Sequence, residues 1–173
     1  MDQTAKLAEV FPDVAKDIRV NLQNVLQAAT LNAEQVWGTA IACAHASRSG
    51  ALKQALEADA RAAGITDATI ADAKAAAVMM GMNNVIYRFK HVIGKEDYEK
   101  RPIRLRMQRL AQVTGNKADF ELFCLAVSAI NNCQNCMAAH EDAVLKQGLT
   151  ADHVWDSVRI AATVHAAAIA VEI

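Results

Sequence analysis

Apolar and polar residues alternate along most of the chain with the period of an α-helix. In the segment 17–29 (DIRVNLQNVLQAA), Ile18, Leu22, Val25 and Leu26 fall on one face of such a helix. The same spacing predicts further helices over 33–47, 51–63, 67–80, 82–93, 103–113, 120–130, 133–147 and 151–171. No segment shows the period-2 alternation of a strand, so we predict an all-α fold.

Residues that start and stop helices divide the pattern. The expected N-caps are Asn32, Thr66, Asp119, either Asn131 or Asn132, and Thr150. Gly81 is expected to interrupt or bend a helix that Gly94 ends, and a charged loop follows from Lys95. Pro102 is suited to open the next helix.

Two stretches of the chain resemble each other. AAGITDATIADAKAAAVM aligns with KQGLTADHVWDSVRIAAT, which pairs Gly64 with 148, Thr66 with 150 and Asp72 with 156. With a small gap upstream, Glu34 aligns with Glu121. We predict one domain over 1–173 that contains a degenerate repeat at about 32–93 and a second repeat, carrying a cysteine pair, at about 117–173. The alternative is chance similarity between alanine-rich helices.

Composition and charge exclude several classes of protein. Apolar residues make up 53% of the chain, and the formal net charge is −1 at pH 7, unlike the strongly basic surface of a nucleic-acid-binding domain. No apolar run approaches the roughly 20 residues of a membrane span. The charged, amphipathic start MDQTAKLAEVFPDVAKDI is unlike a secretory signal. A reducing, cytoplasmic location is therefore expected, where a close cysteine pair is more often catalytic or metal-binding than structural.

The segment INNCQNCMAAHED contains the most informative chemistry. On a helix, Cys133 and Cys136 are neighbours on one face, and His140 extends that face. If Asn132 is the cap, Cys133 lies in the first turn, where unpaired N–H groups and the helix dipole favour a thiolate. The pair could be a redox couple, half of a zinc site, or small residues filling a core. Single cysteines at 43 and 124 fit the last role.

A zinc site is the main chemical alternative to redox chemistry. Cys133, Cys136, His140 and a carboxylate could supply four ligands. Structural zinc sites usually draw on two separated clusters, and the sequence offers no second one, so redox chemistry is favoured. Glu121, taken alone, is typical of an acidic surface residue at a helix N-terminus.

The arrangement Glu121, eleven residues, Cys133-Gln134-Asn135-Cys136, three residues, His140 resembles the AhpD alkyl hydroperoxidase family. This family belongs to the carboxymuconolactone decarboxylase-like superfamily. The likeness extends to FPDVAKDIRVNLQNVL, EQVWGTAIACAHASR, VMMGMNNVIYRF and ADFELFCLAVSAINNCQNCMAAHE.

The resemblance implies an all-α fold with an internal duplication, assembled as a homotrimer. It implies an antioxidant enzyme that reduces alkyl hydroperoxides and carries electrons to the peroxiredoxin AhpC. The electrons would come from dihydrolipoamide on a lipoylated acyltransferase that works with dihydrolipoamide dehydrogenase. No bound cofactor or metal is implied, and neither nucleic acid nor membrane is expected as a partner.

The resemblance also implies roles for four residues. Cys136 would attack the peroxide, pass through a sulfenic acid and form a mixed disulfide with AhpC, while Cys133 would donate a proton and act as the resolving thiol that closes the Cys133–Cys136 disulfide. Glu121 and His140 would form a proton relay. Helix-end electrostatics alone favour Cys133 as the thiolate, but the nearer base, His140, favours Cys136. Family members often have a histidine at the position of Asn135, so direct peroxidase turnover is expected to be slower here.

Two rival functions remain: a decarboxylase of the carboxymuconolactone type, which needs no dithiol, and a non-catalytic zinc-binding helical module.

The basic stretch from Arg88 to Arg109 is either a solvated face or a docking patch for an acidic lipoyl domain or AhpC.

Overall fold

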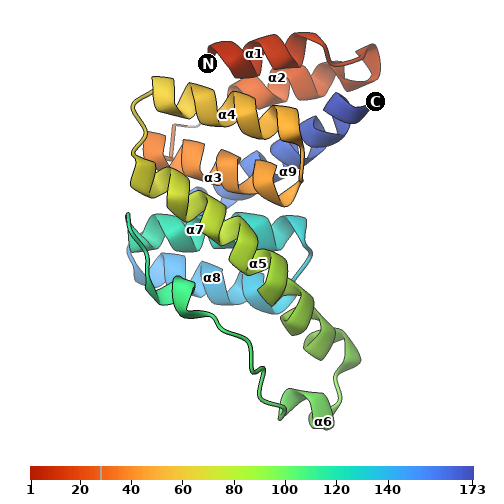
Figure 1. The fold of residues 1–173 in the computed structure, drawn as a ribbon, viewed down its shortest axis with the longest axis vertical. Helices are drawn as coiled ribbons and strands as arrows, with labels where there is room; N and C mark the ends of the chain where they lie inside the picture. Colours follow the sequence, from red (N-terminus) through yellow and green to blue (C-terminus); the bar gives the residue numbers. More distant parts are fainter. Residues whose placement is uncertain (28) are drawn as a thin grey trace.

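The structure, a computed structural model, describes residues 1–27 and 29–173. Within these residues the regular elements are helical and no strand is present, which confirms the predicted all-α fold (Figure 1). In chain order they are α1 (Asp2–Glu9), η1 (Asp13–Ala15), α2 (Lys16–Val25), α3 (Ala33–Ala46), α4 (Gly50–Ala62), α5 (Asp67–Ile93), α6 (Glu96–Glu99), η2 (Gln108–Ala111), α7 (Lys117–Ile130), α8 (Gln134–Lys146) and α9 (Ala151–Glu172); η1 and η2 are 3₁₀ turns.

Helices α3 and α7 form the centre of the core. They pack against each other and against α5 and α9, and α8 packs mainly on α7. The closeness of α3 and α7 depends on Gly38, because a Cβ atom there would lie 2.1 Å from the Phe123 ring. The large, fully buried side chains at the centre include Ile41, Leu122 and Ile160.

The C-terminal part of α5 extends away from this core. Together with α6 and the chain that follows, it forms an arm at the lower end of the molecule in Figure 1. Phe89 and Tyr98 meet edge-to-face on the arm, with ring centroids 5.2 Å apart. Val85, Val92 and Leu105 are exposed on α5 or in the chain after α6. The arm therefore presents apolar side chains that the chain's own core does not cover.

Several expected helix ends agree with the structure. Asn32 and Gln35 form a capping box, and the Thr66 hydroxyl accepts from the backbone N–H of Thr69. Gly94 ends α5 in the left-handed conformation, with φ of 58°. The helix expected over 17–29 is α2, which ends at Val25; the expected end includes Ala28, which lies outside the described residues.

Other expected boundaries are wrong. Helix α5 continues through Gly81, so the expected interruption is wrong, while the alternative of a bend there stays a prediction. Asn116 rather than Asp119 caps α7, because the Asp119 carboxylate instead accepts from Nε2 of Gln35 at 2.8 Å. Neither Asn131 nor Asn132 caps α8, whose N-cap is Cys133.

The helix expected after Pro102 is also wrong. Only the short turn η2 forms there, and Arg104 has a left-handed backbone with φ of 52°. Contrary to the expectation that no segment alternates with period 2, IRLRMQR places its apolar residues at every second position, so a helix would scatter Ile103, Leu105 and Met107 around its surface. An irregular segment leaves Arg104 and Arg106 in solvent and lets Arg109 reach Asp72.

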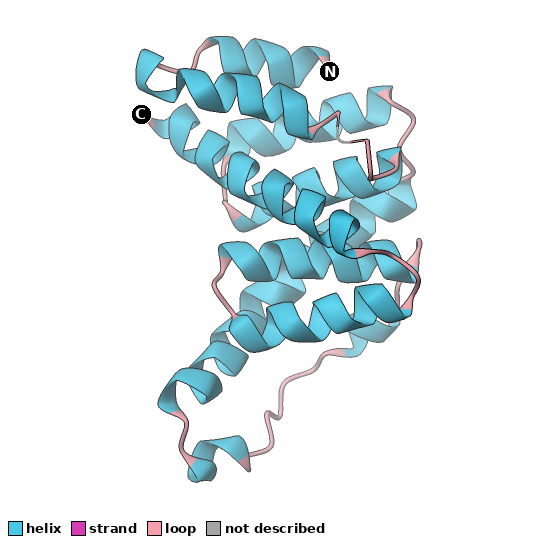
Figure 2. Ribbon diagram, turned by 180° about the vertical axis from the view of Figure 1, so that it is seen from behind, coloured by secondary structure: helices cyan, strands magenta, loops and turns pink. Residues whose placement is uncertain are grey.

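Helix α9 extends one residue beyond the helix expected over 151–171, and its composition departs from the expectation that no apolar segment is long enough for a membrane span. Its 22 residues, with a mean hydropathy of 1.3 over the best window, are long and apolar enough to cross a membrane by length and composition alone. In Figure 2, which views the molecule from behind, α9 crosses the face of the core nearest the viewer. It packs against α2, α3 and α7, with Ile160 and Val164 fully buried. This packing is that of a core helix.

The helices α3–α4–α5 and α7–α8–α9 have matching boundaries. The N-caps Asn32, Ser49 and Thr66 precede Asn116, Cys133 and Thr150 by the same number of positions. When the two halves are aligned by these N-caps, the position equivalent to Glu121 is Trp37. The gapped alignment of Glu34 with Glu121 therefore does not fit. The internal duplication itself stays a prediction.

Candidate functional site

The two cysteines lie side by side at the start of α8. Cys133 is the N-cap residue and Cys136 lies in the first turn, with their Sγ atoms 2.8 Å apart and both thiols free. A disulfide needs about 2.05 Å between the sulfurs, so a small movement of the side chains would close one. Both residues lie close to the positive end of the helix dipole, which therefore does not by itself select Cys133.

The surroundings of the two sulfurs differ. Cys133 is completely buried, whereas Cys136 is 6% exposed and lines a cavity of about 590 Å³. Burial, and next the hydrogen bond with Cys133, raise the pKa of Cys136 to about 12, while the Asn84 amide acts in the opposite direction. The resting thiol is therefore protonated at neutral pH, and its reaction as a nucleophile requires a base.

His140 and Glu121 supply a candidate base beside Cys136. Nδ1 of His140 lies 2.6 Å from Oε2 of Glu121, across the contact between α8 and α7. An ionised carboxylate can only accept, so Nδ1 carries the proton and Nε2 is the basic nitrogen. His140 lines the same cavity as Cys136.

The charge on Glu121 is maintained by a second partner. Nζ of Lys117 lies 2.5 Å from the other carboxylate oxygen, one helical turn earlier on α7. Burial would raise the pKa of Glu121, but the hydrogen bonds from His140 and Lys117 outweigh it and lower the pKa. Glu121 is therefore ionised near neutral pH and accepts the hydrogen bond from Nδ1 of His140.

The cavity is built between α5, α8 and the segment before α7. Its walls combine apolar side chains with a few polar groups: Met80, Asn83, Tyr87, Lys90, Glu99, Met107, Leu110, Asn135, Cys136, Ala139 and His140. Such a volume and lining are typical of a small-molecule site. Asn135 contributes an amide where a histidine would offer another proton carrier.

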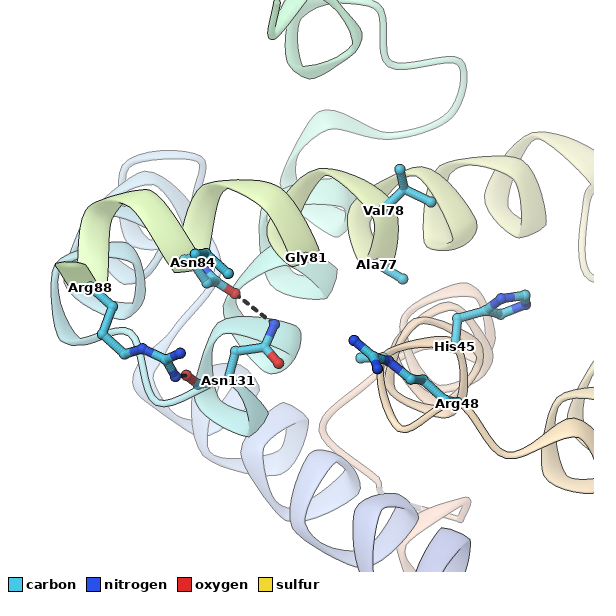
Figure 3. A pocket seen from close by; sticks show the side chains of 10 residues that line it. His45, Arg48, Ala77, Val78, Gly81, Asn84, Arg88 and Asn131 are labelled. Carbon is cyan, nitrogen blue, oxygen red and sulfur yellow. Dashed lines mark hydrogen bonds between the residues drawn. The ribbon is translucent and has the colours of Figure 1, made fainter. Parts of the chain in front are cut away.

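A buried amide network supports the cysteines from α5. Nδ2 of Asn84 donates to Oγ of Ser128 at 3.0 Å, and Oδ1 of Asn84 accepts from Nδ2 of Asn131 at 2.9 Å. Figure 3 shows the latter bond from the side of a second cavity, of about 400 Å³, whose lining includes Arg48 and Arg88. Asn84 thus separates this cavity from the cysteine pair.

Two further residues of α5 hold the turn that leads into α8. Nη1 of Arg88 donates to the Asn131 carbonyl at 2.6 Å, and Nε2 of His91 lies 2.8 Å from Oε1 of Gln134. Within this turn, Asn132 has a left-handed backbone with φ of 52°. Side chains of α5 therefore hold the turn conformation that brings Cys133 next to Cys136.

The remaining cysteines lie apart from this pair. Cys43 and Cys124 are completely buried, and burial raises the pKa of both thiols. They fill space in the core. Among the described residues, no group of three or more His, Cys, Asp or Glu side chains is arranged to hold a metal ion.

The sequence pattern did not reveal the contributions of α5 and Lys117. Met80, Asn84 and Arg88 lie far from the cysteines in sequence, and only the fold brings them to α8. For Lys117 a signal existed: it precedes Glu121 by four residues, the spacing of a helical ion pair.

The chain is similar to several known proteins. The model of the carboxymuconolactone decarboxylase family matches residues 96–172. A protein of Anaeromyxobacter sp. (strain Fw109-5) named alkyl hydroperoxide reductase AhpD is 51% identical over 99% of this chain and 92% of its own. Proteins of the same name from Brucella canis and Rhodospirillum centenum are each 46% identical, over 96% and 91% of this chain and 94% and 84% of their own.

Proposed function

The chain belongs to the AhpD family of alkyl hydroperoxide reductases, and on this basis we propose that it is an antioxidant enzyme whose Cys133–Cys136 dithiol reduces organic hydroperoxides. The observation that carries the proposal is the close pair of sulfurs, 2.8 Å apart, one of which lines a cavity together with a histidine–carboxylate pair. No bound cofactor is needed, because both electrons come from the thiols.

The first step takes place at Cys136. His140 accepts the thiol proton, directly or through water in the cavity, and Glu121 stabilises the resulting imidazolium. The thiolate attacks the terminal oxygen of the hydroperoxide, the O–O bond breaks, and the alkoxide leaves as an alcohol after taking a proton from His140. Cys136 is then a sulfenic acid.

The second step joins the two sulfurs. Cys133 attacks the sulfenic acid, a disulfide forms and water leaves. Cys133 is suited to this role because it is buried behind Cys136, within reach of its sulfur but away from the cavity. Cys136 is the sulfur that an incoming hydroperoxide or partner thiol meets.

The disulfide must be reduced again by another protein. Dihydrolipoamide on a lipoylated acyltransferase, kept reduced by dihydrolipoamide dehydrogenase, is the proposed electron donor. The peroxiredoxin AhpC is the proposed acceptor, through a mixed disulfide with Cys136. These partners are consistent with a cytoplasmic location.

The exposed apolar side chains on α5 and after α6 favour assembly. Val85, Val92 and Leu105 would be covered if this arm packed against neighbouring copies, as in the proposed homotrimer.

The rival functions have less support. A decarboxylase has no use for two sulfurs in contact, and the described residues offer no metal-binding cluster for the zinc module.

Reconstitution tests the proposal. The protein is mixed with AhpC, lipoylated acyltransferase, dihydrolipoamide dehydrogenase, NADH and an alkyl hydroperoxide, and NADH oxidation is followed. We expect hydroperoxide-dependent oxidation with the wild type and almost none with Cys136→Ser or Cys133→Ser. Equal rates for wild type and both variants would refute the dithiol mechanism.

A further inference from the structure

Met80 occupies an unusual position between the two parts of the site. Its Sδ atom lies 3.2 Å from Nε2 of His140 and 3.7 Å from Nδ2 of Asn84. The residue is 1% exposed, yet it forms part of the wall of the cavity that contains Cys136. A thioether is therefore in contact with the basic nitrogen of the proposed relay.

We propose that Met80 is a peroxide-sensitive modification site, whose oxidation to the sulfoxide slows the enzyme. The identity of the oxidant rests on the proposed function, because the hydroperoxide is the substrate that the cavity receives.

The oxidation is balanced without any further reagent. The Met80 sulfur attacks the terminal oxygen of the hydroperoxide, the O–O bond breaks, and the sulfur gains that oxygen. The alkoxide leaves as an alcohol, using the proton that the terminal oxygen gives up. His140, next to the sulfur, can pass this proton from one oxygen to the other. Oxidation of Met80 competes with the attack of Cys136 on the same hydroperoxide. When the dithiol is held oxidised, Cys136 cannot react, and a larger share of the hydroperoxide oxidises Met80.

The product changes the relay because a sulfoxide oxygen is a much stronger hydrogen-bond acceptor than a thioether sulfur. An oxygen at this position would accept from Nε2 only when that nitrogen carries a proton. A sulfoxide oxygen that accepts a hydrogen bond from Nε2 therefore occupies the nitrogen that would accept the Cys136 proton. We expect the activity of the oxidised enzyme to fall.

Two other methionines serve as internal controls. Met82 and Met107 are both more exposed than Met80. Met107 lines the same cavity as Met80. Among the described residues, however, Met80 is the methionine whose sulfur contacts His140. If exposure governed oxidation, Met82 and Met107 would react first; if access through the cavity and the proximity of His140 govern it, Met80 would react at least as fast.

Peptide mass analysis tests the modification. The full chain, with its dithiol first oxidised to the disulfide, is incubated with cumene hydroperoxide, and oxygen uptake at each methionine is followed over time. We expect Met80 to gain one oxygen at least as fast as Met82 and Met107. Complete oxidation of those two while Met80 remains unmodified would overturn the proposal.

Activity measurements test the consequence. Wild type, Met80→Leu and Met107→Leu are treated in the same way, reduced, and assayed against their own untreated samples. We expect wild type and Met107→Leu to lose most of their activity and to regain it with methionine sulfoxide reductases, which do not repair over-oxidised cysteine. Met80→Leu should keep its starting rate. An equal loss in all three proteins, without repair, would contradict the proposal. Hydroperoxide reduction by the untreated wild type reports separately on the proposed function.

Discussion

Nδ1 of His140 lies 2.6 Å from Oε2 of Glu121, and Nζ of Lys117 lies 2.5 Å from the other carboxylate oxygen. The carboxylate is mostly buried, with 12% of its side chain exposed. This pairing lets Glu121 hold the Nδ1 proton of His140 and orient its ring.

Replacement of Glu121 should slow the reaction without removing a sulfur. In Glu121→Gln, the amide no longer stabilises the imidazolium, so we expect the rate of hydroperoxide reduction to fall by about 10²-fold or more. Glu141→Gln, an exposed carboxylate on the same helix as His140, is the matched control and should react like the wild type. An unchanged rate in Glu121→Gln would exclude Glu121 from the relay.

The same carboxylate should also contribute to stability in a pH-dependent manner. Because its hydrogen bonds lower the pKa of Glu121 in the folded state, its contribution is present above the ordinary value of 4.5 and is lost as the pH falls through the lowered folded pKa. Denaturant unfolding of wild type and Glu121→Gln should therefore differ most near neutral pH and converge in acid. A difference that grows as the pH falls would contradict this account.

Asn84 should tune the reactivity of Cys136. Since the Asn84 amide lowers the pKa of Cys136, Asn84→Ala should raise that pKa further and move the pH profile of alkylation to higher pH. The measurement is iodoacetamide labelling of Cys136 in a Cys133→Ser background. Ser128→Ala, which keeps the Asn84 amide but removes its Ser128 partner, should shift the profile less. Equal profiles with and without Asn84 would show that the amide serves only the fold.

Asp72 should be a major stabilising residue outside the site. Its buried carboxylate accepts hydrogen bonds from Arg109, from Thr114 and from the backbone N–H of Gly115, and thereby fixes the segment before α7. Burial raises the pKa of Asp72, but these bonds outweigh it and lower the pKa. We expect Asp72→Asn to reduce the free energy of unfolding by about 3 kcal/mol at neutral pH.

The matched control for Asp72 is Asp156. Its carboxylate bonds only Arg159 among the described residues, so Asp156→Asn should cost about 1 kcal/mol or less. The contribution of Asp72 should disappear as the pH falls below 3.8, through its lowered folded pKa. Equal losses of unfolding free energy in the two variants would show that the three hydrogen-bond partners of Asp72 add no more stability than the single partner of Asp156.

The basic segment after α6 gives a prediction about the electron donor. Arg104 and Arg106 are exposed, whereas Lys100 pairs with Glu96 and Arg109 pairs with Asp72. If this segment docks an acidic lipoyl domain, Arg104→Glu with Arg106→Glu should slow reduction by the lipoylated protein, and added salt should slow the wild type. Free dihydrolipoamide, which is uncharged, should reduce both proteins equally at any salt concentration. A salt-independent rate with the lipoylated protein would rule out electrostatic docking.

The parts of the structure that depend on local sequence were predictable. The apolar stripes gave the helices, and Asn32 and Thr66 gave two of their starts, because a capping side chain acts within its own turn. The cap of α8 was not predictable in this manner, because Cys133 occupies the position and makes no capping bond with its side chain.

The candidate site was only half visible in the sequence. Cys133, Cys136 and His140 lie within eight residues, so helical spacing alone aligns them. Met80 and Asn84 come to the site from α5 through packing. They lie in VMMGMNNVIYRF, a segment that carries the family resemblance, but its local pattern does not assign them to the site. The helix predicted after Pro102 was wrong although its local sequence contained the relevant signal. Pro102 suggested a helix start, but the alternation of apolar and charged positions that follows does not suit a helix.

Trapping of the sulfenic acid shows which of the two sulfurs reacts with the hydroperoxide. Cys133→Ser and Cys136→Ser are each treated with one equivalent of cumene hydroperoxide in the presence of dimedone, and the labelled peptide is identified by mass. The account predicts label on Cys136 in Cys133→Ser and little on Cys133 in Cys136→Ser, because Cys136 shares the cavity with His140. Label on Cys133 alone would reverse the roles of the two sulfurs and contradict the account.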